Sequence, residues 1–191
     1  MHDKLNLTDQ ASYSLVRNRP VESRLDILGH YKAELYRGGK LVWLNQGKNT
    51  IMRAAKTAML SMMFNGDNQY GTWYIGLING TPTPLIDAGD LLSSHPGWTE
   101  YTAYFNGADG RPLERVTWET NSPSNGQVIN SNAALFLINV TTPTLVSGIF
   151  VCTAGIQGIN DGLLWAAAYF YGGGPTVQNG DELKVTYAVQ M

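Results

Sequence analysis

The feature that most constrains this chain is the recurrence of short apolar stretches between tight-turn dipeptides. Asn-Gly occurs five times and Asp-Gly twice, and both dipeptides accept the positive φ angles of a two-residue hairpin turn. The strand-like segments between turns cover residues 72–78, 98–105, 113–119, 133–140, 145–153, 163–170 and 182–190. Many short strands with turn signals between them pair in antiparallel fashion. The sequence therefore predicts a mainly β protein, an antiparallel β-sandwich or a jelly-roll-like barrel.

Two of these segments differ in their apolar pattern. The last one alternates, with Val185, Tyr187 and Val189 on one face and Lys184, Thr186, Ala188 and Gln190 on the other, as in a strand with one buried face. The segment 163–170, LLWAAAYF, does not alternate. An unbroken apolar run of this length indicates a central strand covered on both faces.

A hairpin and a helix are predicted before residue 70. Alternation over 31–35, a Gly38-Gly39 turn and the apolar run 41–44 indicate two strands joined by a tight turn. The period then changes from 2 to 3.6, with Asn49 in a position to cap a helix that ends at Asn65-Gly66. We expect one amphipathic helix over 49–64, packed on the sheet through its alanine and methionine side chains.

The first 29 residues show no sustained period and mix both charge signs. Arg19-Pro20 disfavours a helix at that point. We therefore expect an extended N-terminal arm over 1–29, followed by one β domain over 30–191. An arm of this composition becomes ordered by lying on another surface.

Charge and hydropathy exclude two classes of partner. The net charge is −2, whereas binding to nucleic acid phosphates needs an excess of Lys and Arg. No apolar run reaches the ~18–20 residues of a membrane helix, and the first residues do not resemble a signal peptide. We expect no nucleic acid partner, no membrane association and synthesis in a cytoplasm.

The small net charge hides a segregation along the chain. Residues 1–60 carry ten basic and five acidic side chains, whereas residues 61–191 carry three basic and ten acidic side chains. Such asymmetry predicts complementary surfaces on neighbouring copies or on a partner protein. A solvated arm and helix face accounts for the same basic excess equally well.

Catalytic and metal-binding patterns are weak. His2, His30 and His95 are too far apart for a local metal pair, and a single cysteine, Cys152, excludes a disulfide or a cysteine-rich zinc site. His95 follows two serines in a loop that also holds aspartates, but the sequence has no GxSxG elbow. We expect no metal, no cofactor and no enzymatic activity, with Cys152 a buried apolar side chain.

The aromatic residues between 98 and 104 allow two interpretations. Trp98, Tyr101 and Tyr104 lie in or near a predicted strand, and exposed rings of this kind stack on sugars in carbohydrate-binding sandwiches. The alternative, which we favour, is that the rings fill the core, since large rings supply much of the burial in small β domains.

Five stretches of the chain resemble small β-sandwich virion proteins of tailed bacteriophages. They are WYIGLING at 73–80, HPGWTEYTAY at 95–104, GIFVCTAGIQG at 148–158, GLLWAAAYF at 162–170 and TVQNGDELKVTYAVQ at 176–190. The resemblance spans about two thirds of the chain and rests on strands and turns. Proteins of this kind are head decoration or cement proteins, minor tail proteins and fibre-like proteins.

The resemblance implies a non-enzymatic structural role in a virion that is assembled in the host cytoplasm. The first expectation is a cement or decoration protein that binds the major capsid protein and copies of itself, for example as a trimer. In this role the arm contacts the partner through Tyr13, Arg17, Arg19 and Arg24. The alternative is a tail or fibre-like component that recognises a host surface glycan through Trp98, Tyr101 and Tyr104.

Overall fold

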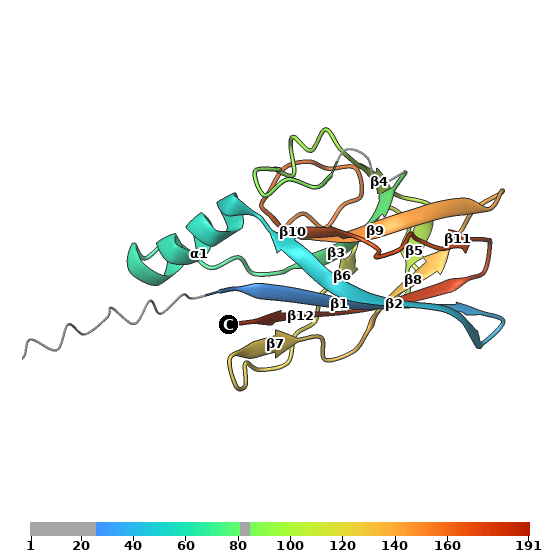
Figure 1. Ribbon diagram of the computed structural model, residues 1–191, viewed down its shortest axis with the longest axis horizontal. Helices are drawn as coiled ribbons and strands as arrows, with labels where there is room; N and C mark the ends of the chain where they lie inside the picture. The colour runs from blue at the N-terminus through green and yellow to red at the C-terminus, as the bar shows by residue number, and fades with distance from the viewer. Residues whose placement is uncertain (1–25, 81–84) are drawn as a thin grey trace, which may run out of the picture.

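A computed structural model describes residues 26–80 and 85–191, which form a nearly closed antiparallel β-barrel with one helix, α1 (Arg53–Phe64), at one end (Figure 1). This architecture confirms the predicted mainly β, antiparallel fold. The strands are β1 (Leu28–Arg37), β2 (Lys40–Ile51), β3 (Tyr74–Asn79), β4 (Thr99–Tyr101), β5 (Tyr104–Asn106), β6 (Val116–Thr117), β7 (Gln127–Ile129), β8 (Ala134–Ile138), β9 (Thr144–Cys152), β10 (Leu164–Tyr169), β11 (Thr176–Val177) and β12 (Glu182–Gln190).

The strand order explains how the barrel comes close to closing. Neighbouring strands follow the order β4-β3-β9-β10-β2-β1-β12-β8-β5, with β6 also beside β3, β7 beside β12 and β11 beside β9. β4 and β5 lie at the two ends of this order but are separated by only two residues of chain. The segment 99–106 therefore bridges the two ends of the sheet, with β4 paired to β3 and β5 paired to β8.

The predicted hairpin before residue 45 is confirmed as β1 and β2. Gly38 and Gly39 have φ angles of 55° and 75°, which fits the two-residue turn that such a glycine pair favours. The pairing register of the two strands shifts between Leu35 and Tyr36: Leu35 lies opposite Trp43, whereas Tyr36 lies opposite Leu41. β2 is long enough to continue past β1 and pair with β10 at its far end.

The core lies between the inner faces of the strands and includes most of β9 and β10. Five of the six residues of β10 are buried, which confirms the prediction of a central strand. β12 alternates as its sequence predicts as far as Tyr187, with Leu183, Val185 and Tyr187 fully buried, but beyond it Ala188 is buried and Val189 only partly so. Cys152, at the end of β9, is a buried free thiol, also as predicted.

The predicted start of the helix at residue 49 is wrong. Residues 49–51 continue β2, since Gly29 lies opposite Asn49 and Ile51 lies opposite Ala166 of β10. Met52 takes the N-cap position, and no side chain caps the helix. The strand extends this far because pairing with β1 at Asn49 and with β10 at Thr50 and Ile51 satisfies backbone groups that a helix start would leave open.

Only part of α1 packs on the barrel. Ala55 is its one fully buried residue, Met59 packs against the core, and the backbone N–H of Met52 bonds the carbonyl of Trp165 at 2.9 Å. Figure 1 shows the helix pointing away from the barrel at the end where β2 finishes. The apolar stripe predicted to lie on the sheet is therefore covered along one side only.

The boundary expected for the N-terminal arm also moves. Leu28 and Gly29, assigned to the arm from the sequence, pair with Gln190 and Val189 of β12 and belong to β1. The short strands β7 and β11 were not predicted, because two or three residues carry no measurable periodicity. Among the described residues, no helix combines the length and the apolar character needed to cross a membrane.

Candidate functional site

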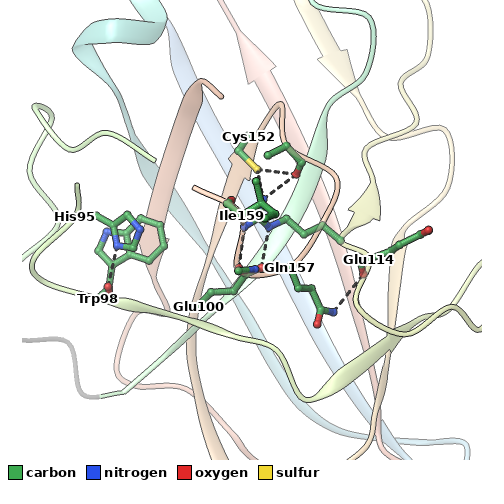
Figure 2. Close-up of polar contacts among 10 residues, drawn as sticks. His95, Trp98, Glu100, Glu114, Cys152, Gln157 and Ile159 are labelled. Atoms are coloured by element: carbon green, nitrogen blue, oxygen red, sulfur yellow. Dashed lines mark hydrogen bonds and ion pairs between the residues drawn. The ribbon is translucent and has the colours of Figure 1, made fainter. Parts of the chain in front are cut away.

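A buried ion pair joins Glu100 of β4 to Arg115, the residue before β6. The Nε and Nη2 groups of Arg115 donate to the two carboxylate oxygens of Glu100, each at 2.7 Å. The Glu100 side chain is only 9% exposed, and the Arg115 side chain is only 1% exposed. The same carboxylate accepts the backbone N–H of Gly158 at 2.7 Å, so the pair is tied to the loop 153–163 (Figure 2).

The remaining donors of Arg115 bind this loop as well. Nη1 donates to the carbonyl of Ala154 at 2.8 Å and to the Sγ of Cys152 at 3.5 Å, and Nη2 donates to the carbonyl of Ile159 at 3.0 Å. Together with the two bonds to the carboxylate, these contacts engage all five N–H groups of the guanidinium. Arg115 therefore has no donor left for a ligand and acts as a structural anchor for the loop.

The electrostatics of this cluster agree with a structural role. Burial alone would lower the pKa of Arg115, but the hydrogen bonds and charge of Glu100 outweigh it and leave that pKa raised. Burial raises the pKa of the Cys152 thiol to about 11, against the lowering effect of Arg115. At neutral pH the thiol is protonated, so it is a poor nucleophile.

The side chains of the loop before β4 bind one another. The His95 ring stacks on Trp98 at 3.8 Å between ring centroids, and its Nδ1 lies 2.8 Å from the Trp98 carbonyl oxygen (Figure 2). The indole N–H of Trp98 donates to Asp90 at 3.2 Å. In the described part of the chain, no hydrogen bond joins a serine hydroxyl to His95, and no group of three or more potential metal ligands is present.

The three aromatic rings considered for sugar stacking lie in the core. Trp98, Tyr101 and Tyr104 are at most 4% exposed. Trp98 packs on Phe150 and Tyr104 on Phe136, with ring centroids 5.1 and 4.9 Å apart. This burial confirms the interpretation favoured from the sequence, that the rings fill the core, and the alternative of an exposed sugar platform at these three residues is wrong.

A cleft of about 660 Å³ with a mixed polar and apolar lining lies beside Glu100 and includes Arg115 in its wall. It combines one aromatic ring with amide and carboxylate side chains. Arg111 at its rim bonds two of the carboxylates, at 3.2 and 3.4 Å, and is itself largely exposed. The polar lining comes mainly from Tyr74, Asn106, Asp109, Glu114, Glu119 and Asn132.

The free end of the β1–β2 hairpin carries exposed apolar side chains. Leu41, Val42 and Leu44 are each about half exposed, and we call these three residues the hairpin-end patch. Trp43 between them turns inward and packs on Phe170 at 5.0 Å. Since β10 pairs with β2 only at residues 50 and 51, the rest of that β2 edge has no strand partner among the described residues.

The partner contacts predicted for the arm, Tyr13, Arg17, Arg19 and Arg24, lie outside the described residues. The sequence reading did not single out the Glu100–Arg115 pair or the hairpin-end patch. The sequence did contain a signal for the patch. A strand with one buried face alternates apolar and polar residues, whereas all four residues of the run LVWL at 41–44 are apolar. No such signal marks Arg115, whose partners lie 15 to 44 residues away in sequence.

Comparison with known proteins provides no relative for this chain: no family model, no curated protein and no solved structure matches it.

Proposed function

We propose that this protein is a non-enzymatic structural component of a phage virion. In this role it is a cement or decoration protein that binds the assembled capsid shell. The observation that carries the proposal is the hairpin-end patch, where Leu41, Val42 and Leu44 are exposed beside a strand edge that no described strand pairs with. Apolar groups clustered on a surface favour a protein partner, and an open edge accepts an extended segment of that partner.

The barrel supports this role by holding the patch stiffly. β1 pairs with β12 along nearly its whole length and with β2 on its other side, so the hairpin extends from a continuous sheet. At the hairpin end, Arg37 donates to both carboxylate oxygens of Asp181, each at 2.8 Å. A patch held in one conformation loses little entropy on binding.

The mechanism is stabilisation by mass action. A protein that binds the assembled shell and not its dissociated subunits shifts the equilibrium toward the shell. Many copies on one shell add their contacts. The segregation of basic residues into 1–60 and acidic residues into 61–191 supports docking between protein surfaces of opposite charge.

The test is binding to capsids stripped of their decoration proteins, taken from the phage that encodes this chain. We expect the protein to cosediment with the shells and raise their thermal transition. The variant Leu41→Gln/Leu44→Gln should bind about 10-fold or more weakly, because about half the burial of two leucines is lost.

The matched control for this experiment is Leu28→Gln, which alters a similarly exposed leucine at the opposite end of the hairpin. It should bind the shells as the unaltered protein does. No binding of the unaltered protein to the shells, or equal loss in both variants, would refute docking through the hairpin-end patch.

A second candidate function, recognition of a host surface glycan, is favoured by the cleft at Arg115. Amide and carboxylate groups around one aromatic ring suit a neutral, hydroxyl-rich ligand. On a glycan array, binding lost in Glu119→Gln and in Asn132→Ala would support this function. Binding that is unchanged in both variants would exclude the cleft as its site.

A further inference from the structure

The helix α1 has an outward face that nothing in the described chain covers. Leu60, Met63 and Phe64 are 49%, 62% and 75% exposed. Leu60 and Phe64 lie on the side of the helix away from Ala55, which faces the barrel, and Met63 lies one turn beyond Met59, at the edge of the barrel-facing side. The apolar surface of α1 therefore extends beyond the part that the barrel covers.

A helix of this length is poorly stable without a partner. Its 12 residues span about 18 Å, and isolated helices this short are marginal in water. The barrel anchors α1 through Met52, Ala55 and Met59, which leaves its C-terminal end without such contacts among the described residues. The last two turns of α1 carry the exposed residues, so packing against a second surface would stabilise them most.

The charges along α1 suggest what that surface is. The first turn has no acidic residue and the last turn has no basic one, so the helix does not complement its own dipole. Instead, the cations Arg53 and Lys56 lie in its N-terminal half. Asp67 lies just beyond its C-terminal end, where it accepts a hydrogen bond from Ser61 at 2.5 Å.

We propose that the outward face of α1 binds the same face of a second copy, with the two helices antiparallel about a two-fold axis. This arrangement packs Leu60, Met63 and Phe64 of one copy against those of the other. It also directs Lys56 of each copy toward the C-terminal end of its partner, where the helix dipole is negative and Asp67 lies. The surface is thus self-complementary in shape and in charge, as a two-fold contact requires.

The inference goes beyond capsid docking and does not depend on it. α1 follows the end of β2, whereas the hairpin-end patch lies at the start of that strand, so both surfaces are available together (Figure 1). One short helix buries less than the ~800 Å² per partner of a standard interface. We therefore expect a reversible dimer with a dissociation constant of about 1 μM or weaker.

The first experiment measures the mass of the full chain by sedimentation across about 1–100 μM, a range chosen to bracket that constant. We expect a monomer–dimer equilibrium, and a monomer throughout for Phe64→Gln. Phe64 is mostly exposed, so this variant keeps its fold, which circular dichroism checks. A monomer at every concentration, a trimer, or a dimer unaffected by Phe64→Gln would overturn the proposal.

A charge exchange tests the antiparallel orientation. Lys56→Glu and Asp67→Lys should each weaken the dimer, and the double variant should recover most of the lost affinity. Lys56→Glu places an anion in the N-terminal half of α1, which its own dipole favours, so weakening cannot reflect a melted helix. Absence of recovery in the double variant would refute this orientation.

A disulfide tests which residues face each other. Met63→Cys lies near the proposed axis, so mild oxidation should convert most of the protein to a covalent dimer. The native Cys152 is buried and stays out of the reaction. Gln46→Cys, on an exposed part of β2, is the matched control and should remain monomeric.

Two further outcomes would reject a second copy as the occupant. Residues 1–25 would take its place if the full chain is a monomer and only the chain 26–191 dimerises. Equal cross-linking of Met63→Cys and Gln46→Cys would indicate random collision. Capsid binding by a protein that is always monomeric would reject the dimer and leave the proposed function intact.

Discussion

Arg115 and Glu100 form two parallel hydrogen bonds of 2.7 Å inside a site where both side chains are almost completely buried. The guanidinium also lies 5.1 Å from the centre of the Phe150 ring, so one of its faces packs on the core. The pair holds the loop 153–163 against β4 and the segment before β6. Its removal should affect both global stability and the order of that loop.

Arg115→Met should lower the free energy of unfolding by about 3–5 kcal/mol, because it leaves the Glu100 carboxylate buried without its partner. Urea denaturation followed by tryptophan fluorescence measures the change. Arg111→Met is the control, since Arg111 is 65% exposed and its ion pairs contribute about 1 kcal/mol or less. A loss below about 1 kcal/mol in Arg115→Met would contradict the anchoring role.

Asp181 should make the protein sensitive to acid. Burial alone would raise the pKa of its carboxyl, but hydrogen bonds from Arg37 and from the Gln178 backbone hold it below its ordinary value of 3.8. The unfolded chain therefore binds a proton at a higher pH than the folded chain does. The stability from this group is complete above pH 3.8 and is lost as the pH falls through the folded pKa.

Denaturant unfolding at a series of acidic pH values tests this. Asp181→Asn should be less stable than the unaltered protein at neutral pH, and the difference should shrink as the pH falls. The control is Asp161→Asn, which alters an exposed loop carboxyl. A constant difference between Asp181→Asn and the unaltered protein at every pH would contradict the assigned pKa direction.

Cys152 should be chemically inert in the folded protein. Its thiol is buried, and burial raises its pKa to about 11, so at about pH 8 it is neither exposed nor ionised. We expect no reaction with a thiol-specific disulfide reagent until denaturant is added, and one equivalent thereafter, read by absorbance. Rapid labelling of the native protein would show that the strand end opens easily.

Asn49 should act through Tyr187 and not as a helix cap. Its Nδ2 donates to the Tyr187 hydroxyl at 2.6 Å, across the intervening strand β1. Asn49→Ala and Tyr187→Phe should each destabilise the protein, with a coupling energy of about 1 kcal/mol in the double variant. Helical content by circular dichroism should not change in Asn49→Ala. Strictly additive losses would refute the contact.

Local sequence signals predicted most of the strands. The glycine pair at 38 and 39 forms the expected turn between β1 and β2. Asn125 and Gly126 likewise have φ angles of 49° and 70°, in a turn that Ser124 and Gln127 close by pairing. Turn chemistry is readable because it depends on the residues of the turn themselves.

The predicted start of the helix was wrong because contacts between residues distant in sequence decide it. Asn49 has the side chain of an N-cap and lies at the start of a helical period, so its local signal favours a helix. Pairing with Gly29 and the bond to Tyr187 involve residues distant in sequence, and they keep Asn49 in a strand. Tertiary contacts overrode the local preference here.

The sequence by itself determined that the chain forms an antiparallel β structure with a hairpin, a helix and a central apolar strand, because period and turn chemistry are local properties. Only the tertiary structure decided which apolar residues are covered. It buries Trp98, Tyr101 and Tyr104 and leaves Leu44 and Phe64 exposed. Burial depends on what each strand or helix packs against, and here that follows from the order in which distant strands close the barrel.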